Sequence, residues 1–175
     1  MTNTNAKWIS AATLLLALFP MVVHGQDITA IPPELALPPS AKLILHAKGK
    51  GDQVYTCRAN NSQFSWILKE PQAELFDENG KVIGHHFAGP AWQLSDKSLV
   101  TGKVVARVNS TSADAIPWLL LTAVDHSGSG LLTRVTDIQR LNTSGGKAPD
   151  TGCDAEHIGN ESRVPYSADY YFFSK

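Results

Sequence analysis

Several patterns that identify common enzyme classes are missing from this sequence. No G-x-G-x-x-G follows an apolar run, which excludes a dinucleotide-binding unit, and no phosphate-cradling loop is present. Neither the zinc motif H-E-x-x-H nor the nucleophile elbow G-x-S-x-G occurs. The net charge is −1 and no basic residues cluster, so nucleic acid is not expected as a partner. The sequence therefore predicts no cofactor and assigns no catalytic residue or metal ligand.

A hydrophobic run long enough to cross a membrane is also missing. Residues 8–23 form the longest apolar run, which is shorter than the about 20 residues that a transmembrane helix needs. This run follows Lys7 and ends before a small-residue pattern at Gly25, an arrangement typical of a signal peptide. We therefore predict that residues 1–25 are a signal peptide cleaved near Gly25. The mature protein is expected to be secreted or periplasmic, without a transmembrane anchor.

Cysteine is scarce, with Cys57 and Cys153 as the two examples. A secreted protein meets an oxidising compartment, so we predict that these two cysteines form a disulfide. In the chain-entropy model this bond would stabilise the fold by about 4 to 5 kcal/mol. The alternative is a reactive thiol pair, which usually has the spacing C-x-x-C, and these two residues do not have it.

What the sequence does contain is a regular alternation of apolar and polar residues. From Lys42 onward the apolar residues mostly recur at every second position, and turn-forming residues interrupt them about every eight to twelve residues. This pattern predicts one all-β domain over residues 43–175, either a β-sandwich or a squat β-barrel of about 8 to 10 strands. Paired prolines precede it, so residues 26–42 are predicted to be an extended segment, a tether or an edge.

Two segments show the alternation most clearly. In residues 62–69, Phe64, Trp66 and Leu68 share one face of a predicted strand. In residues 163–173, the residues that share one face are Val164, Tyr166, Ala168, Tyr170 and Phe172. Both segments are predicted to be strands with one buried face.

Other segments predict turns, a central strand and a long loop. Residues 77–81 predict a tight hairpin turn and residues 125–130 a hairpin loop. Residues 116–124 are apolar on both faces and predict a strand buried on both sides or closed inside a barrel. Residues 143–163 are rich in turn formers and contain Cys153. They predict a long loop held by the disulfide, with room for one short helical turn.

The stretch GHHFAGPAW, residues 84–92, carries the strongest site hypothesis. Successive side chains of a strand point to opposite faces, so His85 is predicted to point outward and His86 inward. Gly89 and Pro90 end the ladder, and Trp92 re-enters after the turn. We expect Trp92 to cap the same cavity that His86 faces.

The aromatic residues suggest a binding module. Most aromatic residues of an all-β domain belong to the core. The functional alternative is an aromatic-lined pocket near His86, Trp92, Trp118 and Tyr55, in which an imidazole and an indole N–H give the few polar contacts that a small ligand needs. The ligand would be a small molecule or a component of the cell envelope.

Two other functions remain open at this stage. A cell-envelope hydrolase or a metal-assisted enzyme could use His86 with Asp96 or Asp125. A metal site would have to assemble from residues scattered along the sequence, namely His86, Asp96, His126 and His157. The third function is a structural envelope or matrix protein without a small ligand.

With these residues in view, the chain resembles the DUF3455 family of secreted bacterial and fungal proteins, a family without an assigned function. The resemblance runs from about Leu43 to the C-terminus. It is carried, in this order, by QVYTC, AELFDENGKVIGHHFAGPAW, IPWLLL, VTDIQRLNTSGG, GCD and RVPYSADYYFF. Both family cysteine motifs match, which agrees with the predicted disulfide.

The family pattern resembles G-x-H-x-x-G-P-T-W followed by D-G-S. It places the family histidine at His86 and the family tryptophan at Trp92. Ala91 stands where the pattern has Thr, which implies that any site works without that hydroxyl. Lys97 stands where the pattern has Gly, which implies a looser turn after Asp96.

Overall fold

The computed structural model describes residue 1, residues 31–61 and residues 63–175. Residues 31–175 form one compact body. The predicted signal peptide, apart from residue 1, and residues 26–30 lie outside the described residues, so the cleavage near Gly25 stays a prediction. In the described part of the chain, no helix combines the length and the apolar character needed to span a membrane.

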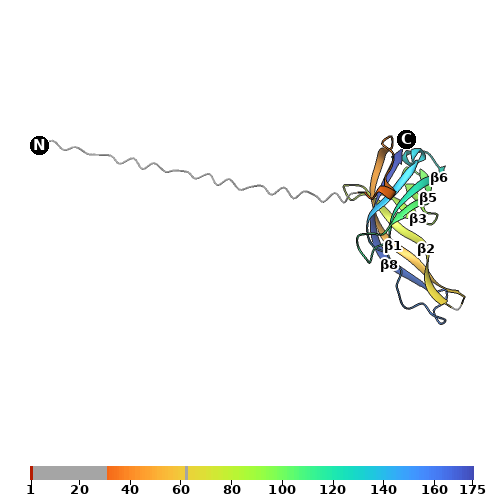
Figure 1. The fold of residues 1–175 in the computed structure, drawn as a ribbon. Coiled ribbons are helices and arrows are strands. Elements are labelled where there is room, and N and C mark those ends of the chain that lie inside the picture. The colour runs from red at the N-terminus through yellow and green to blue at the C-terminus, as the bar shows by residue number, and fades with distance from the viewer. Residues whose placement is uncertain (2–30, 62) are drawn as a thin grey trace. The chain divides into compact units, whose positions relative to one another are not determined.

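The body is a closed barrel of eight antiparallel strands, each hydrogen-bonded to the next in the sequence, with β8 returning to β1 (Figure 1). The strands are β1 Lys42–Asn60, β2 Gln63–Phe76, β3 Val82–Phe87, β4 Ala91–Leu94, β5 Leu99–Val108, β6 Trp118–Ser127, β7 Asp137–Gly145 and β8 Glu161–Ser174. The all-β prediction is confirmed, and closure of the sheet selects the barrel over the sandwich.

The alternation along β8 directs its large residues into the barrel, as predicted. Tyr166, Ala168, Tyr170 and Phe172 are buried, and the residues between them are less so. Opposite them, β1 carries Gly49, where an added Cβ would lie 2.5 Å from the ring of Tyr170. A larger residue at position 49 would therefore displace that ring.

β6 is largely buried on both faces over residues 118–121, which confirms part of the prediction for residues 116–124, whereas Val124 is 58% exposed and the prediction is wrong there. Leu119 and Leu121 belong to the interior core, whereas Trp118 belongs to a second cluster with Leu35 and Leu141. Leu35 comes from a 3-10 turn, η1 Pro33–Leu35, and is completely buried. The prediction of an extended backbone throughout residues 26–42 is therefore wrong at residues 33–35. The chain turns there and packs Leu35 against the apolar outer face of the barrel.

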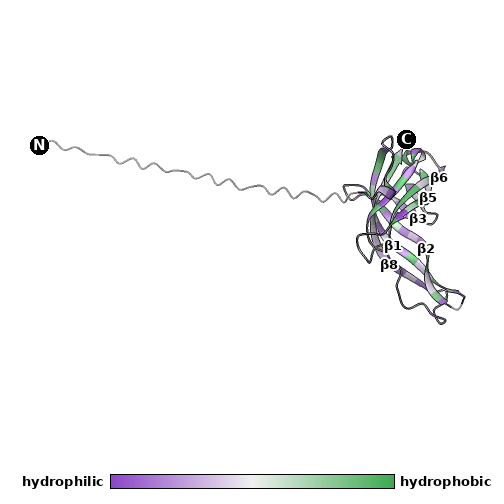
Figure 2. Cartoon of the chain, in the orientation of Figure 1, coloured by the Kyte–Doolittle hydropathy of each residue, from purple (hydrophilic) through white to green (hydrophobic). Residues whose placement is uncertain are grey.

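The β1–β2 hairpin extends past the rest of the barrel, and we call its residues 55–61 and 63–68 the arm (Figure 1). Between Gln63 and Gln72, β2 pairs with β1 and not with β3, whose pairing starts at Ala73. The loop before β8 covers the middle of the arm at Cys57 and Trp66, but Phe64 is 38% and Leu68 50% exposed. The predicted buried face of residues 62–69 is therefore wrong at Phe64 and Leu68, whereas Trp66 between them is partly buried. Figure 2 shows both hydrophobic and hydrophilic residues along the strands.

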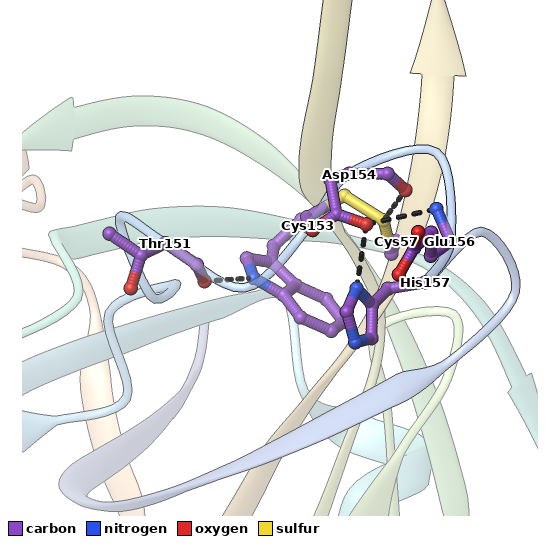
Figure 3. Close-up of a disulfide and its surroundings, with 7 residues drawn as sticks. Cys57, Thr151, Cys153, Asp154, Glu156 and His157 are labelled. Atoms are coloured by element: carbon purple, nitrogen blue, oxygen red, sulfur yellow. Dashed lines mark hydrogen bonds and ion pairs between the residues drawn. A yellow bond between two sulfur atoms is a disulfide. The ribbon is translucent and has the colours of Figure 1, made fainter.

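The disulfide between Cys57 and Cys153 is present, as predicted, and ties the loop before β8 to the arm (Figure 3). The indole N–H of Trp66 also donates to the carbonyl of Thr151, at 2.8 Å. The predicted loop of residues 143–163 is shorter in the structure. β7 ends at Gly145 and β8 begins at Glu161, so the loop comprises residues 146–160. This loop contains turns in place of the predicted helical turn.

The remaining connections agree with the predicted turns in outline. In the turn of residues 77–81, the carboxylate of Asp77 accepts hydrogen bonds from the backbone N–H groups of Asn79 and Lys81. The predicted hairpin loop of residues 125–130 is shifted, because β6 continues to Ser127 and a 3-10 turn, η2 Leu131–Arg134, completes the connection to β7.

Candidate functional site

His86 and Trp92 face each other across the β3–β4 hairpin, inside the barrel. They occupy paired positions of the two strands. Their rings stack with centroids 4.5 Å apart and planes 3° from parallel. His86 is 3% exposed and Trp92 1% exposed, whereas His85 lies on the exposed side. The alternation along β3 therefore separates the two histidines as predicted.

His86 is a neutral imidazole with a fixed tautomer. Its Nδ1 lies 2.8 Å from the carbonyl oxygen of Ala91, and Nδ1 must carry the proton because a carbonyl only accepts. Burial lowers the pKa of His86 to about 3, the hydrogen bond to Ala91 opposes this shift, and the charge of Arg140 adds to it. At neutral pH the ring therefore has no charge, and its Nε2 is an acceptor.

Three residues of β8 complete an aromatic cluster around this pair. The ring of Tyr170 is edge-on to His86 and to Trp92, with centroid distances of 5.1 and 5.7 Å. Phe172 is edge-on to Trp92 at 5.9 Å, and the hydroxyl groups of Tyr166 and Tyr170 lie 3.3 Å apart. Burial raises the pKa of both tyrosines, so they stay protonated. These rings fill the interior of the barrel.

A cavity of about 290 Å³ adjoins this cluster, and we call it the barrel-end cavity because the β3–β4 turn forms part of its wall. Apolar residues supply much of the lining: Leu68, Pro71, Pro90, Val104, Leu119 and Leu121. The polar residues of the lining are Gln53, Lys69, Glu70, His86, Arg107 and Arg140. An apolar wall with a few polar groups is typical of a site for a small ligand.

Arg107 of β5 and Arg140 of β7 line this cavity from the two strands that flank β6. Leu119 of β6 pairs with Arg107 of β5 on one side and with Arg140 of β7 on the other. Because paired residues share a face and Leu119 belongs to the interior core, both arginines lie on that face. Burial lowers the pKa of Arg140, its neighbours Tyr170 and Tyr166 oppose this shift, and the charge of Arg107 adds to it.

The other charged groups of the lining already have partners. Lys69 forms an ion pair with Glu161 at 2.6 Å, and the carboxylate of Glu70 accepts a hydrogen bond from Gln72 at 2.8 Å. Neither arginine of the cavity forms an ion pair with any carboxylate of the described residues. The cavity therefore carries an excess of hydrogen-bond donors.

Tyr55 and Trp118 do not join His86, although the sequence suggested one site for all of them. The hydroxyl of Tyr55 donates to the carbonyl of Gly146 at 2.6 Å, and Tyr55 lines a different cavity of about 450 Å³ together with Lys147, Ala148 and several residues of the segment between β5 and β6. Trp118 lies in the outer cluster under Leu35. Trp92 contacts His86 but is part of the core and does not line the barrel-end cavity. Of the four predicted residues, His86 reaches the cavity.

The two carboxylates considered for catalysis are engaged elsewhere. Asp96 accepts hydrogen bonds from the backbone and the hydroxyl of Ser98 and from the backbone of Leu131, and these bonds lower its pKa. Asp125 accepts from the backbone N–H of His126. Neither carboxylate contacts His86, so the structure supplies no acid–base pair from these residues.

The scattered metal site is not assembled either. His126 contacts the carbonyl of Val135 at 2.8 Å, and His157 contacts Asp154 at 2.6 Å beside the disulfide (Figure 3). In residues 31–61 and 63–175 no group of three or more His, Cys, Asp or Glu side chains could hold a metal ion.

Sequence reasoning did not identify Gln53, Arg107 or Arg140 as site residues. A signal for Arg140 was present, because Ile138 and Arg140 fall on the same face of the segment DIQRL and this places a charge on the apolar face. Gln53 and Arg107 gave no such signal, since short alternating patterns tolerate single polar residues.

Comparisons with known proteins identify a family. The family model described as "Protein of unknown function (DUF3455)" matches residues 38–174. No curated protein and no solved structure matches this chain.

Proposed function

The chain belongs to the DUF3455 family, and we propose that it is a binding protein for a small, partly apolar molecule held in the barrel-end cavity. The observation that carries this proposal is the combination of an apolar wall with His86, Gln53 and Arg140 at the inner end of a space of about 290 Å³. A purely structural barrel would fill its end with apolar side chains, because interiors are normally close-packed.

The aromatic cluster limits the depth of the site. Trp92, Tyr170 and Phe172 are each at most 1% exposed, so the interior beyond His86 has no room for a ligand. A molecule would therefore enter between the β3–β4 turn and β5 and stop against the edge of His86. Up-and-down barrels of eight strands commonly hold one small ligand in this way.

We also propose that the mature chain acts outside the cytoplasm. The Cys57–Cys153 disulfide supports this placement, because disulfides persist in oxidising compartments. Expression of the full chain with its native leader, followed by N-terminal sequencing of the exported protein, tests it. A mature N-terminus near Gln26 is expected, and retention of Met1 on a membrane-bound form would contradict it.

Binding is tested by obstructing the entrance of the cavity. Val104 lines the cavity and is 38% exposed, whereas the next residue, Val105, is 55% exposed and is not part of the lining. Val104→Trp should therefore block the entrance, and Val105→Trp is the matched control. Both variants should fold, since both positions are at the surface.

Octanoate, octan-1-ol, benzoate and benzyl alcohol serve as probes in isothermal titration and saturation-transfer NMR. At least one probe should bind the wild type and Val105→Trp, with about tenfold weaker binding to Val104→Trp. If no probe binds at millimolar concentration, or if both variants bind like the wild type, the cavity is not a binding site and the structural function is favoured.

A further inference from the structure

Two arginines without a counter-ion and one amide N–H without a hydrogen-bond partner, among the described residues, line the barrel-end cavity, and they indicate the charge of its ligand. Arg140 gives two of its five N–H groups to one acceptor, the carbonyl of Pro117, at 3.2 Å from Nε and 2.8 Å from Nη2. A carbonyl does not neutralise a guanidinium. Burying a cation without a counter-charge is costly, so this position is explained if an anion joins it in the functional state.

Gln53 gives an independent indication. It is 2% exposed, and its Nε2 has no hydrogen-bond partner among the described residues. Gln53 lines the same cavity as Arg140. A buried amide N–H group without an acceptor costs free energy, and a ligand that offers oxygen atoms would remove that cost.

Arg107 adds a second positive charge at the entrance. It lies on the other side of Leu119 from Arg140, is exposed, and has no ion-pair partner within residues 31–61 and 63–175. Two guanidinium groups that flank an apolar residue match a ligand with an anionic head and an apolar body.

Resting on the proposed function, we infer that the ligand is a small organic carboxylate whose anionic oxygens are bound by Arg140, Arg107 and Gln53. Its apolar body lies against Leu119 and Val104. His86 is uncharged and contributes an acceptor, so it neither neutralises nor repels the carboxylate strongly. The site therefore discriminates a carboxylate from the neutral alcohol of the same length.

The test compares octanoate with octan-1-ol by isothermal titration on the folded mature protein. Octanoate should bind the wild type about tenfold or more tightly than octan-1-ol. Arg107→Gln should remove most of that preference, with a much smaller loss of affinity for octan-1-ol than for octanoate. Arg134→Gln is the matched control, because it removes the same charge at an exposed residue that lies outside the cavity lining.

Gln53→Leu gives a second readout that a merely structural residue would not give. Leucine has a similar size and leaves no unpartnered N–H, so thermal stability should be equal or higher while the affinity for octanoate falls several-fold. Equal binding of octanoate and octan-1-ol, or equal effects of Arg107→Gln and Arg134→Gln, would overturn the inference but leave the binding function standing. If neither octanoate nor octan-1-ol binds, benzoate and benzyl alcohol give the same comparison, and if none of the four probes binds, the proposed function itself fails.

Discussion

The imidazole of His86 lies flat against the indole of Trp92, and the two rings are held at opposite positions of one hairpin. His86 therefore packs on the core at Trp92 with one face and lines the barrel-end cavity. A change of either ring therefore affects the packing of the barrel, and a change at His85 does not.

Trp92→Ala should destabilise the protein by about 3 to 5 kcal/mol, because the indole is fully buried and contacts three aromatic neighbours. His85→Ala is the matched control on the exposed face of the same hairpin and should change stability by less than about 0.5 kcal/mol. Urea denaturation followed by circular dichroism measures both. Similar effects of the two changes would mean that the inward and outward faces of this hairpin are assigned wrongly.

The stability of the protein should fall as the pH falls from about 6.5 to about 3, in part because of His86. In the unfolded chain this histidine binds a proton near its ordinary pKa of about 6.5, whereas burial keeps it neutral in the fold until the pH reaches about 3. The unfolded state therefore binds more protons in this interval, and the contribution lost is on the order of 4 kcal/mol.

His86→Phe keeps a ring against Trp92 and removes the titration, so it separates this effect from that of the carboxylates. The variant should show a smaller loss of unfolding free energy between pH 6.5 and pH 4 than the wild type. NMR of the wild type should also show that the His86 ring stays neutral at pH 5. A normal titration of His86 near pH 6.5 would contradict the buried geometry.

Lys97→Gly should stabilise the protein by about 1 kcal/mol. Lys97 has φ +70°, a left-handed conformation in which a side chain is strained and glycine is not. In the turn after Asp96, which the resemblance implies to be looser than in the family pattern, the carboxylate of Asp96 accepts hydrogen bonds from Ser98 and Leu131. The looseness of this turn relative to the family stays a prediction. Lys103→Gly, in the middle of β5, is the control and should destabilise by about 0.5 to 1 kcal/mol. Thermal unfolding compares the two.

Removing the disulfide with Cys57→Ala and Cys153→Ala together should cost about 2 to 5 kcal/mol, since the bond closes a loop with a sequence separation of 96. Denaturant titration of the double variant measures this loss. Reduction of the wild type should give a similar loss. If neither treatment changes the midpoint, the contacts of the loop with the arm hold it without the bond.

The sequence predicts the strands well where a single barrel wall separates interior from solvent. In β8 and in the β3–β4 hairpin each strand has one face inside and one outside, so the period of two residues identifies which side chains are buried. The disulfide is predictable because the predicted secretion favours an oxidised state and two cysteines leave one pairing.

The sequence does not predict what depends on contacts between distant segments. Phe64 and Leu68 alternate like core residues, but β2 passes beyond its pairing with β3 at this point, and the loop before β8 covers Trp66 while these two side chains stay exposed. Leu35 is buried because the outer face of β6 happens to lie beside it. Arg107 and Arg140 are 33 positions apart and become a pair only through the register of three strands, which the alternation of each strand alone does not reveal.

The pairing of β1 with β8 has a consequence for how the chain acquires its structure. The barrel can close only by joining the first and last strands of the described chain, from Lys42 with Ser174 to Thr56 with Glu161. Contacts so distant in sequence form late and slow the folding of all-β proteins to milliseconds or seconds. During that interval β1 and β8 each present an unpaired edge, so an open intermediate would be the species most exposed to aggregation.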